Sequence, residues 1–226
     1  MPASVLSPAF VLHARRYGDT SQLVELFDRE QGRAVCVAKG ALTGKRFPRL
    51  QPFQPLLIAL SGRGEVQNLT AAEIAGPPVH LTGKQLYCGL YVNELVLKLT
   101  ARADPSSVLY DDYVKALTGL PNQTPADPVL RTFEVKLLHH LGHALILDRD
   151  ANGSAIDPDR RYCYEVESGP ECSGQPDAPF SGKLFDALGS CTFDDVQIQR
   201  EARVFMRAVL DHHLEGRAIR SRDLFR

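Results

Sequence analysis

Residues 33–63 read RAVCVAKGALTGKRFPRLQPFQPLLIALSGR, a stretch that contains six cations and no Asp or Glu. Two apolar runs, residues 34–38 and 55–60, flank a middle rich in Gly, Lys, Arg and Pro. This pattern predicts two strands joined by a long basic loop. Because Phe47 and Phe53 stand among the cations, the loop has what a polyanion with stackable bases needs. The cations are Arg33, Lys39, Lys45, Arg46, Arg49 and Arg63.

The basic loop also has an ordinary explanation, since surface loops are commonly charged and a solvated loop needs no ligand. Charge alone leaves both interpretations open, and the missing acids are the informative part. Phe53 stands between two prolines and is better explained as a core residue of the barrel than as a base-stacking group.

Strand-like runs surround the basic loop on both sides. Glu30-Gln31-Gly32 is a tight turn signal, because glycine accepts a positive φ. Five short strands at this spacing are typical of a small closed barrel, of which the OB-fold is the commonest that grips single strands. The expected strands are residues 9–14, 20–28, 34–38, 55–60 and 66–72.

From Leu81 onward the apolar period becomes helical, which predicts an α+β protein with two domains. We expect an OB-fold domain at residues 1–78 and a helical domain at residues 79–226. The helical domain is interrupted at about 148–179 by an irregular insertion with one short hairpin around residues 162–166. The first expected helical stretch begins near Leu81. The later expected helices span residues 107–120, 128–147, 181–189 and 194–214.

Composition gives the class of protein but conceals a division of charge. The 226 residues are 44% hydrophobic and 23% charged, as in an ordinary folded protein, with a net charge of −1. Residues 1–80 and 200–226 each carry an excess of three cations, whereas residues 81–199 carry an excess of seven acids. Basic ends around an acidic middle suit one surface for nucleic acid and another that avoids it. No signal peptide or membrane span is evident, and five widely spaced cysteines indicate reduced thiols, so a cytoplasmic protein is expected.

Catalytic motifs are not found in the sequence. It has no phosphate-binding loop and no nucleophile motif. His139, His140 and His143 form a compact trio, in which His139 and His143, four residues apart on one helix face, could hold a metal. No acidic or Cys partner is identifiable nearby, so an ordinary helix is favoured. The same holds for His212-His213. Cys163 and Cys172 lack Cys-x-x-Cys mates and are interpreted as unpaired thiols, whereas Cys36 and Cys88 are expected in the core.

Six short motifs occur in order along nearly the whole chain. They are RYGDTS at 16–21, Gly32 with VAKGA at 37–41, LQPF at 50–53, YVNEL at 91–95, FEVKLL at 133–138 with Leu141-Gly142, and Ser221-Arg222. Together they resemble the motifs of the bacterial RecO family of recombination mediators. The resemblance implies an OB-fold, a helical domain and no catalysis. It also implies binding of single- and double-stranded DNA, strand annealing, association with the nucleoid, partnership with RecR, and contact with the acidic C-terminal tail of single-strand-binding protein.

Many members of that family carry a four-cysteine zinc module that opens L-D-x-C-x-x-C-G. The corresponding segment here is LDRDANG at 147–153, where Asp150 and Asn152 stand about where cysteines would. Cys172 could match a third ligand, but Gln175 stands at the fourth position. Zinc is therefore doubtful, and no cofactor is expected.

These considerations lead to a hypothesis about the binding residues. We expect the DNA backbone to follow Arg15, Arg16, Lys39, Lys45, Arg46 and Arg49, with Phe47 or Phe53 available for stacking. An acidic peptide that ends in an apolar residue would meet Arg217, Arg220 and Arg222, although cations near a helix end also complement its dipole. A protein-interaction adaptor with basic surfaces is the alternative, and a hydrolase using the histidine trio would take up metal.

Overall fold

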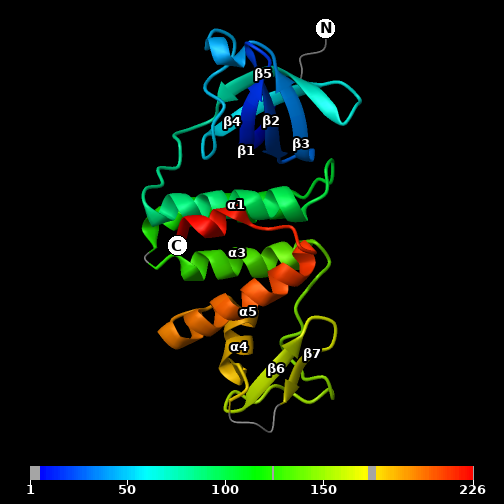
Figure 1. The fold of residues 1–226 in the computed structure, drawn as a ribbon, viewed down its shortest axis with the longest axis vertical. Coiled ribbons are helices and arrows are strands. Elements are labelled where there is room, and N and C mark those ends of the chain that lie inside the picture. Colours follow the sequence, from blue (N-terminus) through cyan, green and yellow to red (C-terminus); the bar gives the residue numbers. More distant parts are fainter. Residues whose placement is uncertain (1–5, 124, 173–176, 226) are drawn as a thin grey trace. The chain divides into compact units, whose positions relative to one another are not determined.

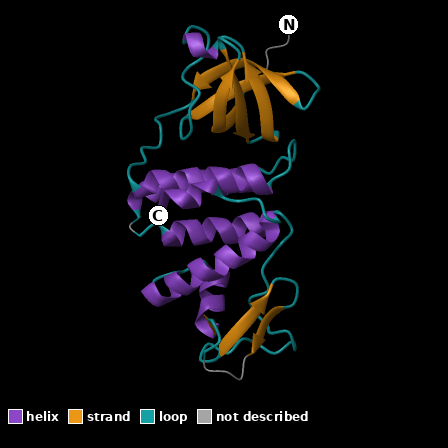
Figure 2. Ribbon diagram, in the orientation of Figure 1, coloured by secondary structure: helices purple, strands orange, loops and turns teal. Residues whose placement is uncertain are grey.

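The structure is a computed structural model that describes residues 6–123, 125–172 and 177–225. The chain forms two compact units. The first unit comprises Met1–Asn122 and Ile219–Arg226, and the second comprises Gln123–Ala218. Figure 1 traces both in sequence colours, and Figure 2 shows a sheet-rich part followed by helices and a small second sheet.

Five strands of the first unit close into a barrel. They are β1 (Ser7–Tyr17), β2 (Ser21–Asp28), β3 (Gly32–Ala38), β4 (Pro55–Ser61) and β5 (Val66–Ile74), in the order β1-β2-β3-β5-β4. β4 pairs with β1 to complete the circle, and β3 runs parallel to β5. Alternate side chains such as Val24, Leu26 and Ile58 fill the interior with no exposed surface. The expected five-stranded OB-like barrel and the α+β class are confirmed.

Gly32 is required by two features of its turn. Its φ is 73°, and a Cβ at this position would lie 2.2 Å from the backbone oxygen of Asp104. The turn between β2 and β3 can therefore approach the backbone at Asp104 only because residue 32 has no side chain.

Two helices join the barrel within the first unit, α1 (Lys84–Leu99) and α2 (Ser107–Gly119). Asn93 is buried and donates from Nδ2 to the backbone oxygen of Leu12 at 3.2 Å, while its Oδ1 accepts from the hydroxyl of Tyr113 at 2.8 Å. The ring of Tyr113 in turn meets Phe10 and Phe27 edge to face. Burial of a satisfied polar side chain among aromatic rings fixes both helices on β1 and β2.

The C-terminal 3-10 helix η3 (Arg220–Phe225) lies along α1 in the same unit. Glu94 holds its first turn, because its two carboxylate oxygens accept from the backbone nitrogens of Arg220 at 3.0 Å and Ser221 at 2.8 Å. The short helices η1 (Ala41–Thr43) and η2 (Leu120–Asn122) complete the unit.

The second unit combines α3 (Asp127–His140), α4 (Gly182–Ser190) and α5 (Val196–Leu214) with a small sheet. The sheet contains β6 (Arg161–Glu165), β7 (Gly169–Cys172) and β8 (Phe180–Ser181), in the order β7-β6-β8. The hairpin expected around residues 162–166 is thus present. Asp195 caps α5 by accepting from the backbone nitrogen of Gln197 at 2.6 Å.

The helix expected over residues 128–147 is shorter than its apolar pattern indicated, and that prediction was wrong at its C-terminal end. α3 ends at His140, where Gly142 adopts a φ of 80°. The backbone nitrogen of His143 then bonds to the oxygen of Leu138 at 2.8 Å, which is a glycine-terminated helix end. The apolar residues that follow serve other contacts, since Ile146 packs against Gly169 of β7.

None of the helices in the described residues combines the length and the apolar character that crossing a lipid bilayer requires.

Candidate nucleic-acid interface

The strand register places the first three expected binding residues at one end of the barrel. Arg16 of β1 pairs with Gln22 of β2, and Gln22 pairs with Ala38 of β3. Arg15 and Arg16 of β1, and Lys39 directly after β3, therefore lie at the end of the barrel where the β1–β2 turn lies, on the two strands that flank β2. Antiparallel pairing with β2 brings these strand ends level with each other.

The basic loop between β3 and β4 is fastened to the same end. Gly40 and Gly44, both in the left-handed region with φ of 77° and 67°, enclose η1. The backbone nitrogen of Leu42 donates to the oxygen of Thr20 in the β1–β2 turn at 2.9 Å. Lys45 and Arg46, which come directly after Gly44, therefore leave the anchored helix beside the turn.

Two apolar residues hold the rest of this loop. Phe47 and Leu50 are each 5% exposed and belong to the barrel core. Phe47 is thus a core residue, and the expectation that it could stack on bases was wrong. The guanidinium of Arg46 lies 5.1 Å from the centre of the Phe47 ring. Anchors on both sides keep Arg46 and Arg49 at the surface of a fixed backbone.

Phe53 is also buried, as favoured from its prolines, but it packs against α1 rather than inside the barrel. A Cβ added to Gly89 of α1 would lie 2.8 Å from its ring. Neither phenylalanine of the basic loop is therefore available to a base.

Cations and acids are distributed unevenly around the barrel. The six expected DNA-binding residues are all exposed, and within the described ranges none of them forms an ion pair with a carboxylate. Arg16 instead donates to the backbone oxygens of Gly18 and Asp19, which fixes its guanidinium over the turn. Arg33 behaves differently, because it lies 3.4 Å from Glu25 and is half-buried. We call Arg15, Arg16, Lys39, Lys45 and Arg46 the cationic end, with Arg49 further along the same loop.

The sequence interpretation missed one residue of the cationic end. Tyr17, the last residue of β1, is 53% exposed and stands beside Arg16 at the turn. Leu42 of the anchored η1 is 43% exposed. An exposed ring on a rigid hairpin is suited to stacking on a base. The sequence signal that could have identified Tyr17 is its position directly after two arginines and directly before the turn glycine.

The three C-terminal arginines are divided between the two units. Arg217 belongs to the second unit, where its guanidinium donates to the backbone oxygens of Leu214 and His213 at the end of α5. Arg220 and Arg222 belong to the first unit. Arg220 is exposed, whereas the guanidinium of Arg222 lies 5.8 Å from the centre of the Tyr91 ring on α1. Arg217 thus lies at the C-terminal end of α5, where a cation complements the helix dipole.

The residues of the insertion do not fit a shared zinc ion. Tyr162 pairs with Cys172 across the hairpin, so Cys163, the next residue of β6, points to the opposite face of the sheet. Asp150 Oδ1 accepts from the backbone nitrogens of Asn152 at 2.9 Å and Ser154 at 2.8 Å, so this oxygen is engaged in the local turn. Gln175 lies outside the described residues. That the protein works without zinc stays a prediction, which metal analysis would test.

The histidines pair in a way that the sequence did not indicate. His143 lies beyond the end of α3 and stacks on His213 of α5 with ring centres 4.3 Å apart. Burial, with the neighbouring His143 and His212, lowers the pKa of His213. In the part of the chain that the structure describes, no three His, Cys, Asp or Glu residues come together as metal ligands would.

The buried Cys36 is a core residue, as expected, and burial raises the pKa of its thiol to about 12.

A closed barrel of this topology, with a cationic and partly aromatic end, defines the class of OB-fold proteins. Residues 1–78 match the family model "Recombination protein O N terminal", and residues 80–223 match "Recombination protein O C terminal". The chain belongs to the RecO family.

Curated relatives agree with this assignment over almost their whole length. The chain is 42% identical to the DNA repair protein RecO of Methylococcus capsulatus, over 98% of this chain and 93% of that protein. It is 41% identical to the DNA repair protein RecO of Nitrosococcus oceani, over 97% of this chain and 92% of that protein. The counterpart in Nitrosospira multiformis is 38% identical over 97% of this chain and 93% of its own length.

Proposed function

We propose that this protein acts in DNA repair as a recombination mediator. It binds single- and double-stranded DNA through the cationic end of the barrel, anneals complementary strands, and helps load recombinase onto DNA coated with single-strand-binding protein. The observation that carries the proposal is a set of exposed cations without carboxylate partners on an anchored scaffold, joined by Tyr17. Family membership supports the repair role. Such a protein would work in the cytoplasm, at the nucleoid.

The proposed mechanism needs no chemical step by the protein. Phosphates displace counterions as they meet Lys45, Arg46 and their neighbours, so affinity falls steeply with salt. Two strands neutralised on one surface repel each other less, and pairing of their bases then proceeds without a nucleotide cofactor. Tyr17 stacks on an unpaired base and holds it outside a duplex until a complementary strand arrives.

The deciding experiment reverses two charges on the anchored loop. In a Lys45→Glu/Arg46→Glu protein we expect affinity for single-stranded DNA to fall about 100-fold at low salt, taking roughly 1.4 kcal/mol for each reversed charge. The dependence of log affinity on log salt should become shallower by about 1.4, since two phosphate contacts are lost. Fluorescence anisotropy with labelled oligonucleotides across a salt series measures both quantities.

A matched control changes the net charge equally on the second unit. Arg200 and Arg207 are exposed on α5, and an Arg200→Glu/Arg207→Glu protein should bind DNA nearly as the unaltered protein does. Circular dichroism would verify that both variants fold. Unchanged affinity of the Lys45→Glu/Arg46→Glu protein at low salt would remove the loop from DNA binding.

The partners are part of the proposal. RecR and the acidic C-terminal tail of single-strand-binding protein are the expected protein partners, and Arg220, which is exposed, is the C-terminal arginine that we expect to meet an acidic tail. A titration with a peptide ending in acidic residues and Phe tests this. Loss of binding in an Arg220→Ala protein supports the site, and no binding to the unaltered protein contradicts it.

The alternative is a protein-interaction adaptor whose cationic end meets acidic protein surfaces. A polyglutamate chain would then compete with oligonucleotides at equal charge, and base identity would not matter. The exposed Tyr17 favours DNA, because a ring adds affinity for bases that an acidic peptide does not offer.

A further inference from the structure

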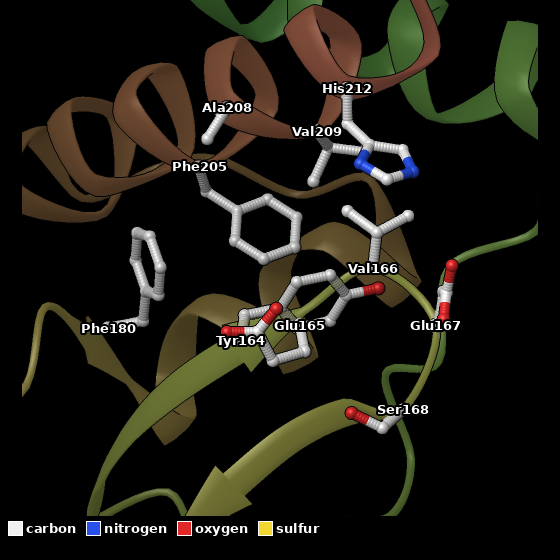
Figure 3. Close-up of a pocket in the computed structure, with 10 residues that line it drawn as sticks. All are labelled: Tyr164, Glu165, Val166, Glu167, Ser168, Phe180, Phe205, Ala208, Val209 and His212. Atoms are coloured by element: carbon white, nitrogen blue, oxygen red, sulfur yellow. The ribbon is translucent and has the colours of Figure 1, made fainter.

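A hollow of about 550 Å³ opens on the second unit between α5 and the small sheet. Figure 3 shows α5 on one side and, on the other, β6 with the turn that leads to β7. Every residue that lines the hollow belongs to the second unit, so its shape is set by one compact body. The cationic end of the barrel contributes nothing to it.

The floor of the hollow is aromatic. The ring of Tyr164 lies 4.6 Å from that of Phe205, and the ring of Phe180 lies 5.2 Å from it, both in edge-to-face arrangement. Val166 and Val209 continue the apolar lining toward His212. Rings already packed against one another present a rigid apolar surface, which can accept a side chain without reorganising.

The rim of the hollow is acidic. Glu165 and Glu167 are exposed, and across the described segments of the chain neither forms an ion pair. Among the lining residues that the structure describes there is no Lys or Arg. The cation nearest along β6, Arg161, is held by Glu201 at 3.0 Å and by the backbone oxygens of Ala178 and Pro179. Two unpaired carboxylates beside an aromatic floor attract a cation next to an apolar group.

We propose that this hollow is a docking site for a basic segment of a protein partner, in which one aromatic or long aliphatic side chain stands beside Lys or Arg. The apolar side chain enters between Tyr164, Phe205 and Val209, and the flanking cations meet Glu165 and Glu167. The sign of the rim excludes an acidic peptide from this site. The site is therefore distinct from the proposed contact of Arg220 with an acidic tail, and it does not depend on DNA binding.

The test uses two synthetic peptides and the full chain. The basic probe is acetyl-Lys-Phe-Lys-Leu-Lys-amide, and the acidic probe replaces each Lys by Glu. In an NMR titration of the ¹⁵N-labelled protein, we expect the basic probe to bind at least about tenfold more tightly than the acidic one, since two rim charges each contribute roughly 0.7 kcal/mol. The amide signals of Val166, Ser168 and Ala208 should move most.

Three variants locate the effect. Ala208→Trp fills the hollow from an exposed position of α5 and should abolish binding of the basic probe. Glu165→Lys/Glu167→Lys should lower its affinity about tenfold or more. The matched control Glu171→Lys/Asp186→Lys makes the same change of charge at exposed positions outside the hollow and should leave binding unchanged.

Several results would overturn the proposal. Equal affinity for both probes would remove the role of the rim, and full binding by the Ala208→Trp protein would place the peptide elsewhere. No binding of the basic probe at about 1 mM would rule out a docking site of useful strength. If Ala208→Trp instead changes the oligomeric state in analytical ultracentrifugation, the occupant is a second copy of this chain and the proposed partner is wrong.

Discussion

In the first unit, the cations around the β1–β2 turn face solvent without carboxylate partners, whereas several arginines of the second unit are held by acids of the same unit. Arg161 binds Glu201, Arg203 binds Asp127, and Arg131 is buried beside Glu134. The two regions contain the same kind of side chain, but the partners differ. A paired arginine contributes to the packing of its own unit, and an unpaired one leaves its charge for a ligand.

Acids follow the opposite pattern in the two regions. Glu25 of β2 is shared by Arg33 and Arg102, so the charge of this barrel acid is neutralised. In the second unit, Glu165 and Glu167 are unpaired at the hollow. The cationic end thus offers unpaired positive charge and the hollow offers unpaired negative charge, and the sign predicts which class of partner each surface binds.

The largest effect is expected when an acid that pairs with an arginine of the second unit is removed, because that pair is proposed to stabilise its own unit. Glu201 is 9% exposed and accepts from Arg161 at 3.0 Å and from the backbone nitrogen and hydroxyl of Ser181 at 2.9 and 2.8 Å. In a Glu201→Ala protein these donors lose their acceptor. We expect the free energy of unfolding of the second unit to fall by about 2–3 kcal/mol, less than for a fully buried pair because Arg161 is about a third exposed.

Urea denaturation followed by circular dichroism measures the loss of stability in the Glu201→Ala protein, with Glu171→Ala on the exposed face of the same hairpin as control. DNA affinity should stay unchanged while the chain remains folded. A stability loss below about 0.5 kcal/mol, the usual range for surface substitutions, would show that the network does not hold β8 to α5.

A smaller effect is expected from the aromatic ring at the cationic end. Tyr17→Ala should lower affinity for single-stranded DNA by about 1–3 kcal/mol, the usual contribution of one stacked base. The salt dependence should not change, because no phosphate contact is lost. Tyr17→Phe should retain affinity, since the ring and not the hydroxyl makes the contact. Anisotropy with single-stranded, duplex and abasic oligonucleotides separates these terms.

The outcome for Tyr17 is independent of the outcome for the loop. If Tyr17→Ala leaves single-strand affinity unchanged while Lys45→Glu/Arg46→Glu lowers it, the cationic end binds phosphates without stacking. Equal losses on single strands and on abasic strands would show that Tyr17 supports the turn rather than a base.

The barrel could be predicted from the sequence because short runs of strand length are separated by turn signals that contain glycine. The fourth strand was expected at residues 55–60 and is found at Pro55–Ser61. The predicted C-terminal end of the third helix was too late in the sequence, because Leu145, Ile146 and Leu147 continue the apolar pattern although α3 ends before Gly142. Pattern alone does not reveal that Ile146 packs on β7, because that contact joins segments distant in the sequence.

The candidate site was predictable only in part for the same reason. A run without acids is visible in the sequence, but Glu25 reaches Arg33 across a strand pair, and so one cation of the run is neutralised. Phe47 looks available among cations, yet the barrel closes over it. The acidic rim of the hollow depends on Arg161 being held by Glu201, forty positions along the chain, so no local pattern indicates it.

The smallest expected effect sharpens the comparison between acids that hold backbone in the two units. Burial raises the pKa of Glu94, but the hydrogen bonds from Ser221 and Arg220 outweigh it, and the pKa lies below its ordinary value of 4.5. A carboxylate with a lowered pKa in the folded state stabilises the protein above its unfolded pKa, and this contribution disappears as pH falls through the folded pKa.

In a Glu94→Gln protein one acceptor oxygen remains, so we expect a loss of about 1 kcal/mol at pH 7. Amide exchange of Arg220 and Ser221 should accelerate, while that of Ser181, held by Glu201, should not. The difference in stability between the two proteins should shrink as pH falls from about 4.5 toward 3, below the unfolded pKa. A difference that stays constant over this range would mean that Glu94 holds η3 through packing and not through its charge.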